Sequence, residues 1–221
     1  MKVGVLFSGG KDSCLALHKA IEEGHEIVCL LNVFTKNRDS FMFHKPDLRL
    51  LNRQAEMLGI KLIIEESAGE KEKELYDLER LISRVKNDVE GIVAGGIESK
   101  YQGNRVKKIC DKLGLKLITP VLGYDSTRLW HELLDSGFKV IMTKISCEGL
   151  DSGWIGRVID KKAFSELKKL SEKYKFRLDF EGGEAETAVT WMPEFKKEIK
   201  LVFEVESEDR YRHFLKIKSV A

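Results

Sequence analysis

Short apolar runs alternate with amphipathic stretches through the first half of the chain. The runs cover residues 2–7, 26–33, 61–65, 91–94 and 116–119, and each has the length of a buried strand. Between them, apolar residues recur three or four positions apart, as in Leu75, Leu78, Ile82 and Val85. This spacing predicts helices over about 12–23, 47–58, 70–86 and 99–113.

Residues at the ends of these stretches support the helix boundaries. Asp47 can cap the helix that follows it, because its carboxylate can accept an unpaired backbone N–H group. Gly24 and Gly59 stand where two helices should end. Pro120 stops the last of the five predicted strands.

Strands that alternate with helices form a parallel sheet covered by helices on both faces. We therefore predict an α/β fold with a five-stranded, parallel, doubly wound, Rossmann-like sheet. Such sheets bind ligands beyond the carboxyl ends of their strands. The loops at Ser8, after Val33 and at Gly95 should meet at that edge.

After residue 124 the regular alternation is lost. The pattern predicts helices over 126–136 and 163–173, a strand over 139–145, a loop over 177–187 and a terminal hairpin over 201–217. We therefore divide the chain into two domains, residues 1–124 and a smaller α+β domain, residues 125–221.

Composition and charge narrow the class of protein. The net charge of +2 argues against a surface dominated by nucleic-acid binding, so we expect no stable nucleic-acid partner. No apolar run is long enough to span a bilayer, and Met1 leads directly into the first strand. The four cysteines form no Cys-x-x-Cys pair, which disfavours a zinc site or a dithiol. We expect a cytoplasmic protein with no membrane partner.

The clearest chemical signal lies between the first strand and the first helix. There the sequence reads Ser8-Gly9-Gly10-Lys11-Asp12-Ser13. A helix N-terminus preceded by glycines offers unpaired N–H groups and a positive dipole to an anion, and phosphate suits it. The stretch is not a Walker A loop, because Val5 stands where that motif needs glycine. The simpler alternative is a Gly-Gly turn with a capping side chain.

A second signal is the acidic segment at 181–187. Glu181, Glu184 and Glu186 flank a Gly-Gly turn. Such carboxylates can hold a cation, either Mg²⁺ or ammonium. A solvent-facing acidic turn is the alternative.

Three further residues are weaker candidates. His44 lies in the loop after the second strand and is either a substrate contact or a packed surface histidine. Tyr101 and Arg105 share one helix turn, so they either reach a phosphate or a partner, or pair on the helix surface.

The order of several motifs resembles a known family. The Ser8–Ser13 loop resembles that of the PP-loop, N-type ATP pyrophosphatases, which have a Rossmann-like, HUP-type fold. Together with further stretches, it is similar to the diphthine–ammonia ligase (diphthamide synthase) family. These stretches are 41–44, 95–99, 148–151, 154–157 and 181–187.

The resemblance implies a reaction and its reactants. Members of the family amidate diphthine, a modified histidine of elongation factor 2, with ammonium and ATP, and release AMP and pyrophosphate. The implied route is an acyl-adenylate, and the implied cofactors are ATP and Mg²⁺. Free ammonium is the simpler nitrogen source, because no amidotransferase domain is visible in the sequence.

The resemblance also assigns roles to the two domains and to single residues. Residues 1–124 would be a nucleotide-binding domain, and residues 125–221 would bind the substrate with the Glu-Gly-Gly-Glu loop. Ser8, Gly9, Gly10, Lys11, Asp12 and Ser13 would hold the phosphates, with Lys11 and Asp12 catalytic and Asp12 also near magnesium. The nucleotide side would include Asn32, Gly95, Gly96, Glu98 and Ser99. The substrate side would include His44, Tyr101, Arg105, Glu181, Gly182, Gly183, Glu184, Glu186 and Thr187, with Glu184 and Glu186 catalytic.

The sequence departs from the usual family pattern at a few positions. Phe180 stands where glycine is common, Val121-Leu122 where Leu-Trp is common, and Ala188 where a larger apolar residue is common. Two other functions stay open: a tRNA-modifying PP-loop enzyme and a non-catalytic ATP-binding sensor. A homodimer, with the hairpin as its contact, is also open.

Overall fold

A computed structural model describes residues 1–35, 47–68, 73–95 and 100–221. The chain forms two compact units. The first comprises residues 1–8 and 12–122, and the second comprises residues 9–11 and 123–221. Each unit is described by itself.

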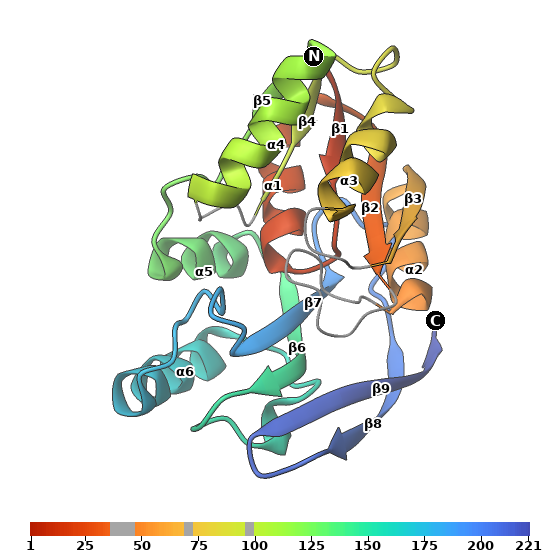
Figure 1. The fold of residues 1–221 in the computed structure, drawn as a ribbon. Coiled ribbons are helices and arrows are strands. Elements are labelled where there is room, and N and C mark those ends of the chain that lie inside the picture. Colours follow the sequence, from red (N-terminus) through yellow and green to blue (C-terminus); the bar gives the residue numbers. More distant parts are fainter. Residues whose placement is uncertain (36–46, 69–72, 96–99) are drawn as a thin grey trace. The chain divides into compact units, whose positions relative to one another are not determined.

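The first unit contains a parallel sheet of five strands (Figure 1). The strand order is β3-β2-β1-β4-β5. Every neighbouring pair runs parallel. The strands are β1 (Lys2–Leu6), β2 (Glu26–Thr35), β3 (Lys61–Ser67), β4 (Gly91–Val93) and β5 (Lys116–Ile118).

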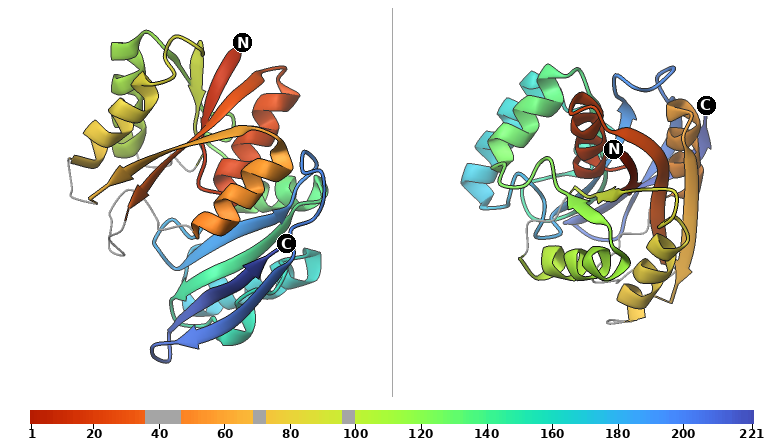
Figure 2. Two further views of the ribbon diagram at one scale, coloured as in Figure 1. Left: turned by 90° about the vertical axis from the view of Figure 1, so that its right-hand side faces the viewer. Right: turned by 90° about the horizontal axis from the view of Figure 1, so that it is seen from above.

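Helices cover both faces of this sheet. They are α1 (Lys11–Glu22), α2 (Leu48–Leu58), α3 (Lys73–Ser83) and α4 (Lys100–Leu113). Both views of Figure 2 show α1 and α2 on one face and α3 and α4 on the other. The chain moves outward from β1 in one direction through β3 and then in the other through β5, so the strand order reverses beside β1. The predicted doubly wound sheet is confirmed, and β1 ends at the reversal where such folds bind ligands.

The buried residues explain why α3 and α4 pack on the sheet. Leu78, Ile82 and Val85, which the helical spacing put on one face, are all buried, and they join Ile92 of β4 and Cys110 of α4 in one cluster. The apolar stripe of each helix therefore meets the apolar strands directly.

The predicted ends of α2 agree with the structure, because residues next to the helix cap them. The Asp47 carboxylate accepts the Arg49 N–H, and Gly59 has the left-handed conformation. The helix predicted over 70–86 is shorter, because α3 ends at Ser83. Arg84 and Val85 donate to carbonyls three residues back, so the last turn tightens and leaves the α-helix.

The second unit contains an antiparallel sheet of four strands in the order β7-β6-β9-β8. Its elements are α5 (Ser126–Asp135), β6 (Lys139–Ser146), a short 3₁₀ helix (Ser152–Trp154), α6 (Lys161–Tyr174), β7 (Ala185–Trp191), β8 (Leu201–Ser207) and β9 (Arg212–Val220). The predicted hairpin is confirmed as β8 and β9, which pair along their length. The smaller α+β part of the predicted fold is therefore confirmed as well.

The predicted loop at 177–187 is wrong at its end, because β7 begins at Ala185. The sequence prediction missed this strand. Polar residues and a Gly-Gly pair precede it, and its alternation is weak, so pairing with β6 is what makes it a strand. Glu186 and Thr187 are consecutive strand residues, and their side chains point to opposite faces of the sheet.

An aromatic cluster forms much of the core beside α5 and α6. The Trp130 ring of α5 lies 5.6 Å from Phe164 of α6 and 6.2 Å from Phe180. Phe176 lies 6.5 Å from Phe180. Two side chains of the segment that links α6 to β7, Phe176 and Phe180, are therefore buried in this cluster, while residues 181–183 are exposed.

Candidate active site

The end of β1 is fixed by Asn32 of β2. The Asn32 side-chain amide donates to the Phe7 carbonyl at 2.8 Å, and the Phe7 N–H donates to the Leu31 carbonyl at 2.8 Å. The Asn32 side chain is buried, and its Oδ1 has no hydrogen-bond partner among the described residues. Asn32 therefore fixes the chain directly before Ser8. Its Oδ1 atom could still accept a hydrogen bond. The structure does not test its predicted contact with a nucleotide.

The two serines of the Ser8–Ser13 segment lie together. Their hydroxyl oxygens are 3.1 Å apart, and the Ser8 N–H donates to Ser13 Oγ at 3.2 Å. These contacts curl the chain between β1 and α1. A segment curled in this way presents hydroxyl and N–H donors at a helix N-terminus, which is the arrangement that binds phosphate.

Gly95, just after β4, lies directly against the start of α1. A Cβ atom on Gly95 would be 2.2 Å from the Asp12 carbonyl oxygen, so no other residue fits without moving backbone. The prediction assigned Gly95 to the nucleotide side. The structure gives it a packing role as well, because it sets how closely the first turn of α1 approaches β4.

Residues 9–11 belong to the second unit and are held by β7. Gly9 has a φ of 75°, and its carbonyl accepts the Val189 N–H at 3.0 Å. The Lys11 N–H donates to Thr187 Oγ1 at 3.2 Å. Lys11 is the first residue of α1, and Thr187 thus accepts one of the N–H groups that a helix start leaves without an intrahelical partner. Sequence analysis assigned Thr187 to the substrate side and missed this contact.

Lys11 is buried, with 3% of its surface exposed. Its Nζ donates to the Asp179 carbonyl at 2.5 Å and lies 5.6 Å from the centre of the Phe180 ring. Phe180 has a φ of 64°, which is rare for a bulky residue. The phosphate-loop lysine is therefore attached to the segment before β7. No sequence motif singled out Asp179, and Phe180 stood out only as a departure from the family pattern.

Arg177 fixes the Asp179 carboxylate. Its guanidinium donates to both carboxylate oxygens, at 2.9 and 2.7 Å, and the Glu181 N–H donates at 3.0 Å. Burial raises the pKa of Asp179, but these hydrogen bonds and the charges of Arg177 and Lys11 outweigh burial, so the pKa lies below its usual value. The carboxylate therefore stays ionised and holds the turn at neutral pH.

The carboxylates of the acidic segment do not converge. Glu181 is exposed. Glu184 accepts the Arg177 N–H at 3.1 Å through Oε1, while Glu186 forms an ion pair with Lys144 of β6 at 3.0 Å. In the part of the chain that the structure describes, no group of three or more His, Cys, Asp or Glu residues could hold a metal ion. The predicted role of these glutamates in holding a cation stays a prediction.

One carboxylate oxygen of Glu184 differs from the other in its contacts. Its Oε2 is buried and has no hydrogen-bond partner among the described residues. The carboxylate lies beneath the turn, since a Cβ on Gly182 would be 2.6 Å from Glu184 Oε1. Gly182 therefore leaves room for the carboxylate, and Gly183 supplies the left-handed φ of 84° that the turn requires.

Several predicted site residues lie outside the described residues. They are His44, Gly96, Glu98 and Ser99. Tyr101 lies in α4, but its side chain is also outside the described part. Arg105, on the same helix, is half-buried. The predicted roles of these residues stay predictions.

Three of the four cysteines lie in surroundings that disfavour the thiolate form. Burial raises the pKa of Cys29, Cys110 and Cys147 to about 11, and nearby carboxylates add to the effect. Cys14 is fully buried. The thiolate is the nucleophilic form, so these environments do not suit sulfur transfer.

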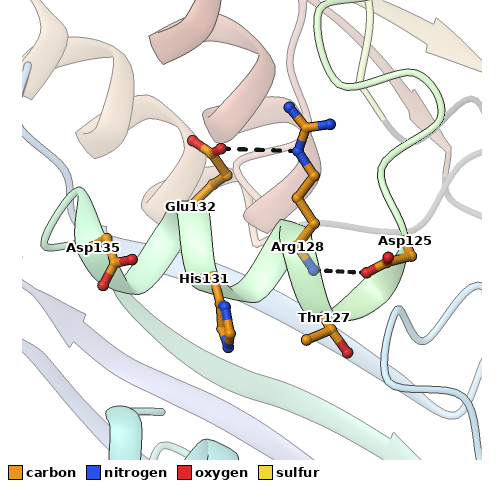
Figure 3. A pocket seen from close by; sticks show the side chains of 6 residues that line it. All are labelled: Asp125, Thr127, Arg128, His131, Glu132 and Asp135. Atoms are coloured by element: carbon orange, nitrogen blue, oxygen red, sulfur yellow. Dashed lines mark hydrogen bonds and ion pairs between the residues drawn. The ribbon is translucent and has the colours of Figure 1, made fainter.

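A shallow hollow of about 380 Å³ lies along α5 (Figure 3). Figure 3 shows Arg128 and Glu132 on one side of the helix and Thr127 and His131 on the other. Asp125 and Asp135 complete its lining. Among the described residues, none of the predicted site residues lines this hollow.

Among the described residues, no helix has the length and apolar character needed to cross a membrane.

Comparison with known proteins identifies matches along both parts of the chain. The family model described as "Diphthamide synthase N-terminal domain" matches residues 1–117, and "Diphthamide synthase C-terminal domain" matches residues 125–221. A Mus musculus protein named diphthine–ammonia ligase is 31% identical over 90% of this chain and 82% of its own length. A Schizosaccharomyces pombe protein of the same name is 33% identical over 99% of this chain, which spans 39% of that relative's length.

Comparison with solved structures also gives a match. It is described as a predicted subunit of tRNA methyltransferase from Methanocaldococcus jannaschii. It is 19% identical, covers 90% of this chain and all of its own, and has a TM-score of 0.47.

Proposed function

The chain belongs to the diphthamide synthase family, and from this premise we propose that it is a diphthine–ammonia ligase. The acceptor would be diphthine on elongation factor 2, the nitrogen source ammonium, and the energy source ATP. The products would be diphthamide, AMP and pyrophosphate. The observation that carries this proposal is the curled segment Ser8–Ser13, with Lys11 fixed on the segment that precedes β7.

The chemistry requires activation of a carboxylate. Ammonia cannot displace oxide from a carboxylate, so the carboxylate oxygen first attacks the α-phosphorus of ATP, and the bond to the β-phosphate oxygen breaks. This step releases pyrophosphate and forms an acyl-adenylate. Ammonia then attacks the acyl carbon, AMP leaves with the bonding electrons, and the ammonium-derived nitrogen loses a proton to a base.

The Ser8–Ser13 segment suits the departing pyrophosphate. Its donors are hydroxyls, backbone N–H groups and the Lys11 ammonium, which can stabilise charge that develops on phosphate oxygens. Gly9 has the positive φ that turns successive N–H groups toward an anion. Asn32 and Gly95 support this role, because they fix the strand end before Ser8 and the first turn of α1.

For magnesium, the described residues supply few ligands. Asp12 is the one carboxylate of the phosphate loop, and Mg²⁺ is commonly bound by one or two carboxylates together with substrate phosphates and water. We propose that Asp12 contributes to magnesium binding only when the nucleotide is present. The ion would supply charge neutralisation on the phosphates.

For ammonium, Glu184 is the better candidate of the two predicted catalytic glutamates. Its Oε2 is a buried acceptor without a partner among the described residues, whereas the Glu186 carboxylate is paired with Lys144. A buried carboxylate oxygen with unused acceptor capacity favours a cationic hydrogen-bond donor. We propose that Glu184 binds ammonium and that residues 125–221 bind the acceptor.

The products formed from ATP test the proposal. The protein is incubated with ATP, Mg²⁺ and ammonium, with and without elongation factor 2 that carries diphthine, and nucleotides are separated by chromatography. AMP and pyrophosphate that appear only with both ammonium and the acceptor are the expected result. ADP as the product would contradict the role of the Ser8–Ser13 segment, and the absence of turnover with this acceptor would contradict the ligase assignment.

Two substitutions test the roles of single residues. Lys11→Ala should lower the rate on the order of a hundredfold, the effect of losing one charge-stabilising donor. Lys19→Ala is the matched control, because Lys19 lies on the same helix and pairs with Glu22 at the surface. Glu184→Gln should raise the ammonium concentration needed for half-maximal rate, with Glu204→Gln on the terminal hairpin as its control. A change only in the affinity for ATP would contradict the role of Glu184.

A further inference from the structure

The turn before β7 is fixed by contacts on either side of Asp179. The Trp130 indole N–H donates to the Leu178 carbonyl at 2.8 Å. The Asp179 carboxylate receives Arg177 and the Glu181 N–H. Because these anchors use the carboxylate of Asp179 and the carbonyl of Leu178, the Asp179 carbonyl remains to accept from Lys11.

Phe180 adopts a conformation that its side chain disfavours. Its φ of 64° lies in the left-handed region, where bulky residues are rare and persist only if the surroundings impose them. The ring is buried, with Trp130 and Phe176 beside it. The packing of the ring therefore maintains the conformation, and the conformation places the ring beside the Lys11 ammonium.

The Lys11 ammonium contacts two uncharged groups at this turn, and the charge of the Asp179 carboxylate attracts it as well. One is the Asp179 carbonyl, and the other is the face of the Phe180 ring at 5.6 Å. A carbonyl dipole and an aromatic face attract an ammonium without cancelling its charge. These two contacts can therefore fix the direction of the ammonium, and neither of them neutralises its charge.

We propose that Phe180 is a positioning residue, which holds the Lys11 ammonium in the direction needed to bind the pyrophosphate group of the nucleotide. This role rests on the proposed function of the Ser8–Ser13 segment. It differs from a purely structural role because its effect must pass through Lys11. Removing the ring should therefore weaken phosphate binding only while Lys11 is present.

The decisive variant is Phe180→Gly. Glycine adopts the left-handed conformation without strain, and the contacts of Trp130 with Leu178 and of Arg177 with Asp179 remain. The turn and the Asp179 carbonyl should therefore stay in place while the ring is lost. We expect a loss in pyrophosphate affinity on the order of fivefold to thirtyfold, the range for an interaction between a partly desolvated cation and an aromatic ring. Phe180→Tyr keeps the ring and should retain nearly full affinity.

The experiment is a double-mutant cycle read by calorimetric titration with inorganic pyrophosphate and Mg²⁺. The wild type, Phe180→Gly, Lys11→Ala and the double variant are compared. Positioning predicts a loss from Phe180→Gly in the wild-type background and no further loss in the Lys11→Ala background. Phe176→Leu, a change in the same aromatic cluster, is the control and should leave the affinity within about twofold.

The outcomes separate the two proposals. If Lys11→Ala lowers pyrophosphate affinity but Phe180→Gly lowers it equally in both backgrounds or not at all, the positioning role is overturned and the phosphate role of Lys11 stands. If the wild type and Lys11→Ala bind pyrophosphate equally, the proposed role of Lys11 fails, and the positioning role fails with it. Should Phe180→Gly not fold, Phe180→Leu replaces it in the same cycle, since leucine keeps apolar packing but lacks an aromatic face.

Discussion

Replacing Gly95 with alanine tests whether packing sets the geometry of the phosphate loop. The added Cβ would lie 2.2 Å from the Asp12 carbonyl oxygen and 2.7 Å from its carbonyl carbon. Both atoms belong to backbone, so no side-chain rotation can relieve the clash. The start of α1 or the end of β4 must move.

The size of the movement follows from these distances. Real Cβ contacts are essentially never shorter than 3.0 Å, so the distance between the new Cβ and the Asp12 carbonyl oxygen must grow by at least 3.0 − 2.2 = 0.8 Å, through movement of either backbone. Overpacking of this kind costs about 1–3 kcal/mol of stability. A misplacement of about 1 Å in a catalytic group can lower a rate on the order of a hundredfold. We therefore expect a modest loss of stability and a large loss of activity.

The assay pairs thermal unfolding with the rate of pyrophosphate release. Gly114→Ala is the matched control, because Gly114 has a φ of +73° and open space around it. Its substitution costs stability through backbone strain, about 1–3 kcal/mol, without pushing on the phosphate loop. Gly95→Ala should lose stability and rate together, whereas Gly114→Ala should lose stability alone.

Two results would refute the reasoning. An unchanged rate in Gly95→Ala would mean that the contact with Asp12 does not set the loop geometry. Equal rate losses in both variants would mean that activity follows overall stability rather than the position of α1.

Two further predictions follow from the pKa shifts. The thiols of Cys29, Cys110 and Cys147 have pKa values of about 11, so few of them are thiolates at pH 8. We expect slow labelling of these cysteines by iodoacetamide in the native protein and fast labelling after unfolding, measured by mass spectrometry. Fast labelling of the native protein would contradict the raised pKa values. The pKa of Asp179 in the folded protein lies below its usual 3.8. The ionised carboxylate therefore stabilises the folded protein above about pH 4, and this contribution to stability is lost as the pH falls through the pKa of the folded protein. Asp179→Asn should therefore unfold at lower urea than the wild type near pH 7, and this difference should shrink below about pH 4; a difference independent of pH would refute the ion-pair role.

The local pattern of apolar and polar residues determines the strands and helices of the first unit. The apolar runs and the helical spacing of residues such as Leu78 and Ile82 predicted the strands and helices, because each element must bury the apolar side chains that it carries. Asp47 and Gly59 fixed the ends of α2 through contacts within a few residues. The phosphate loop was also visible, because its chemistry lies in one continuous segment.

Other features depend on residues far apart in the chain. Lys11 lies 176 residues from Thr187 and 168 residues from Asp179 along the sequence, so no local pattern predicts these contacts. The same holds for Glu186, which was predicted beside Glu184 but pairs with Lys144. Its side-chain direction depends on where β7 begins, and β7 exists because β6 supplies hydrogen-bond partners.

The sequence by itself therefore determined the order of elements, the parallel sheet and the position of the Ser8–Ser13 segment along the chain. Only the tertiary structure decided which groups hold Lys11, which glutamate keeps an unused oxygen and why Gly95 must be glycine. The physical reason is that secondary structure follows from patterns a few residues long. The direction of a side chain and the closeness of two backbones are set by packing between elements that the chain brings together only when it folds.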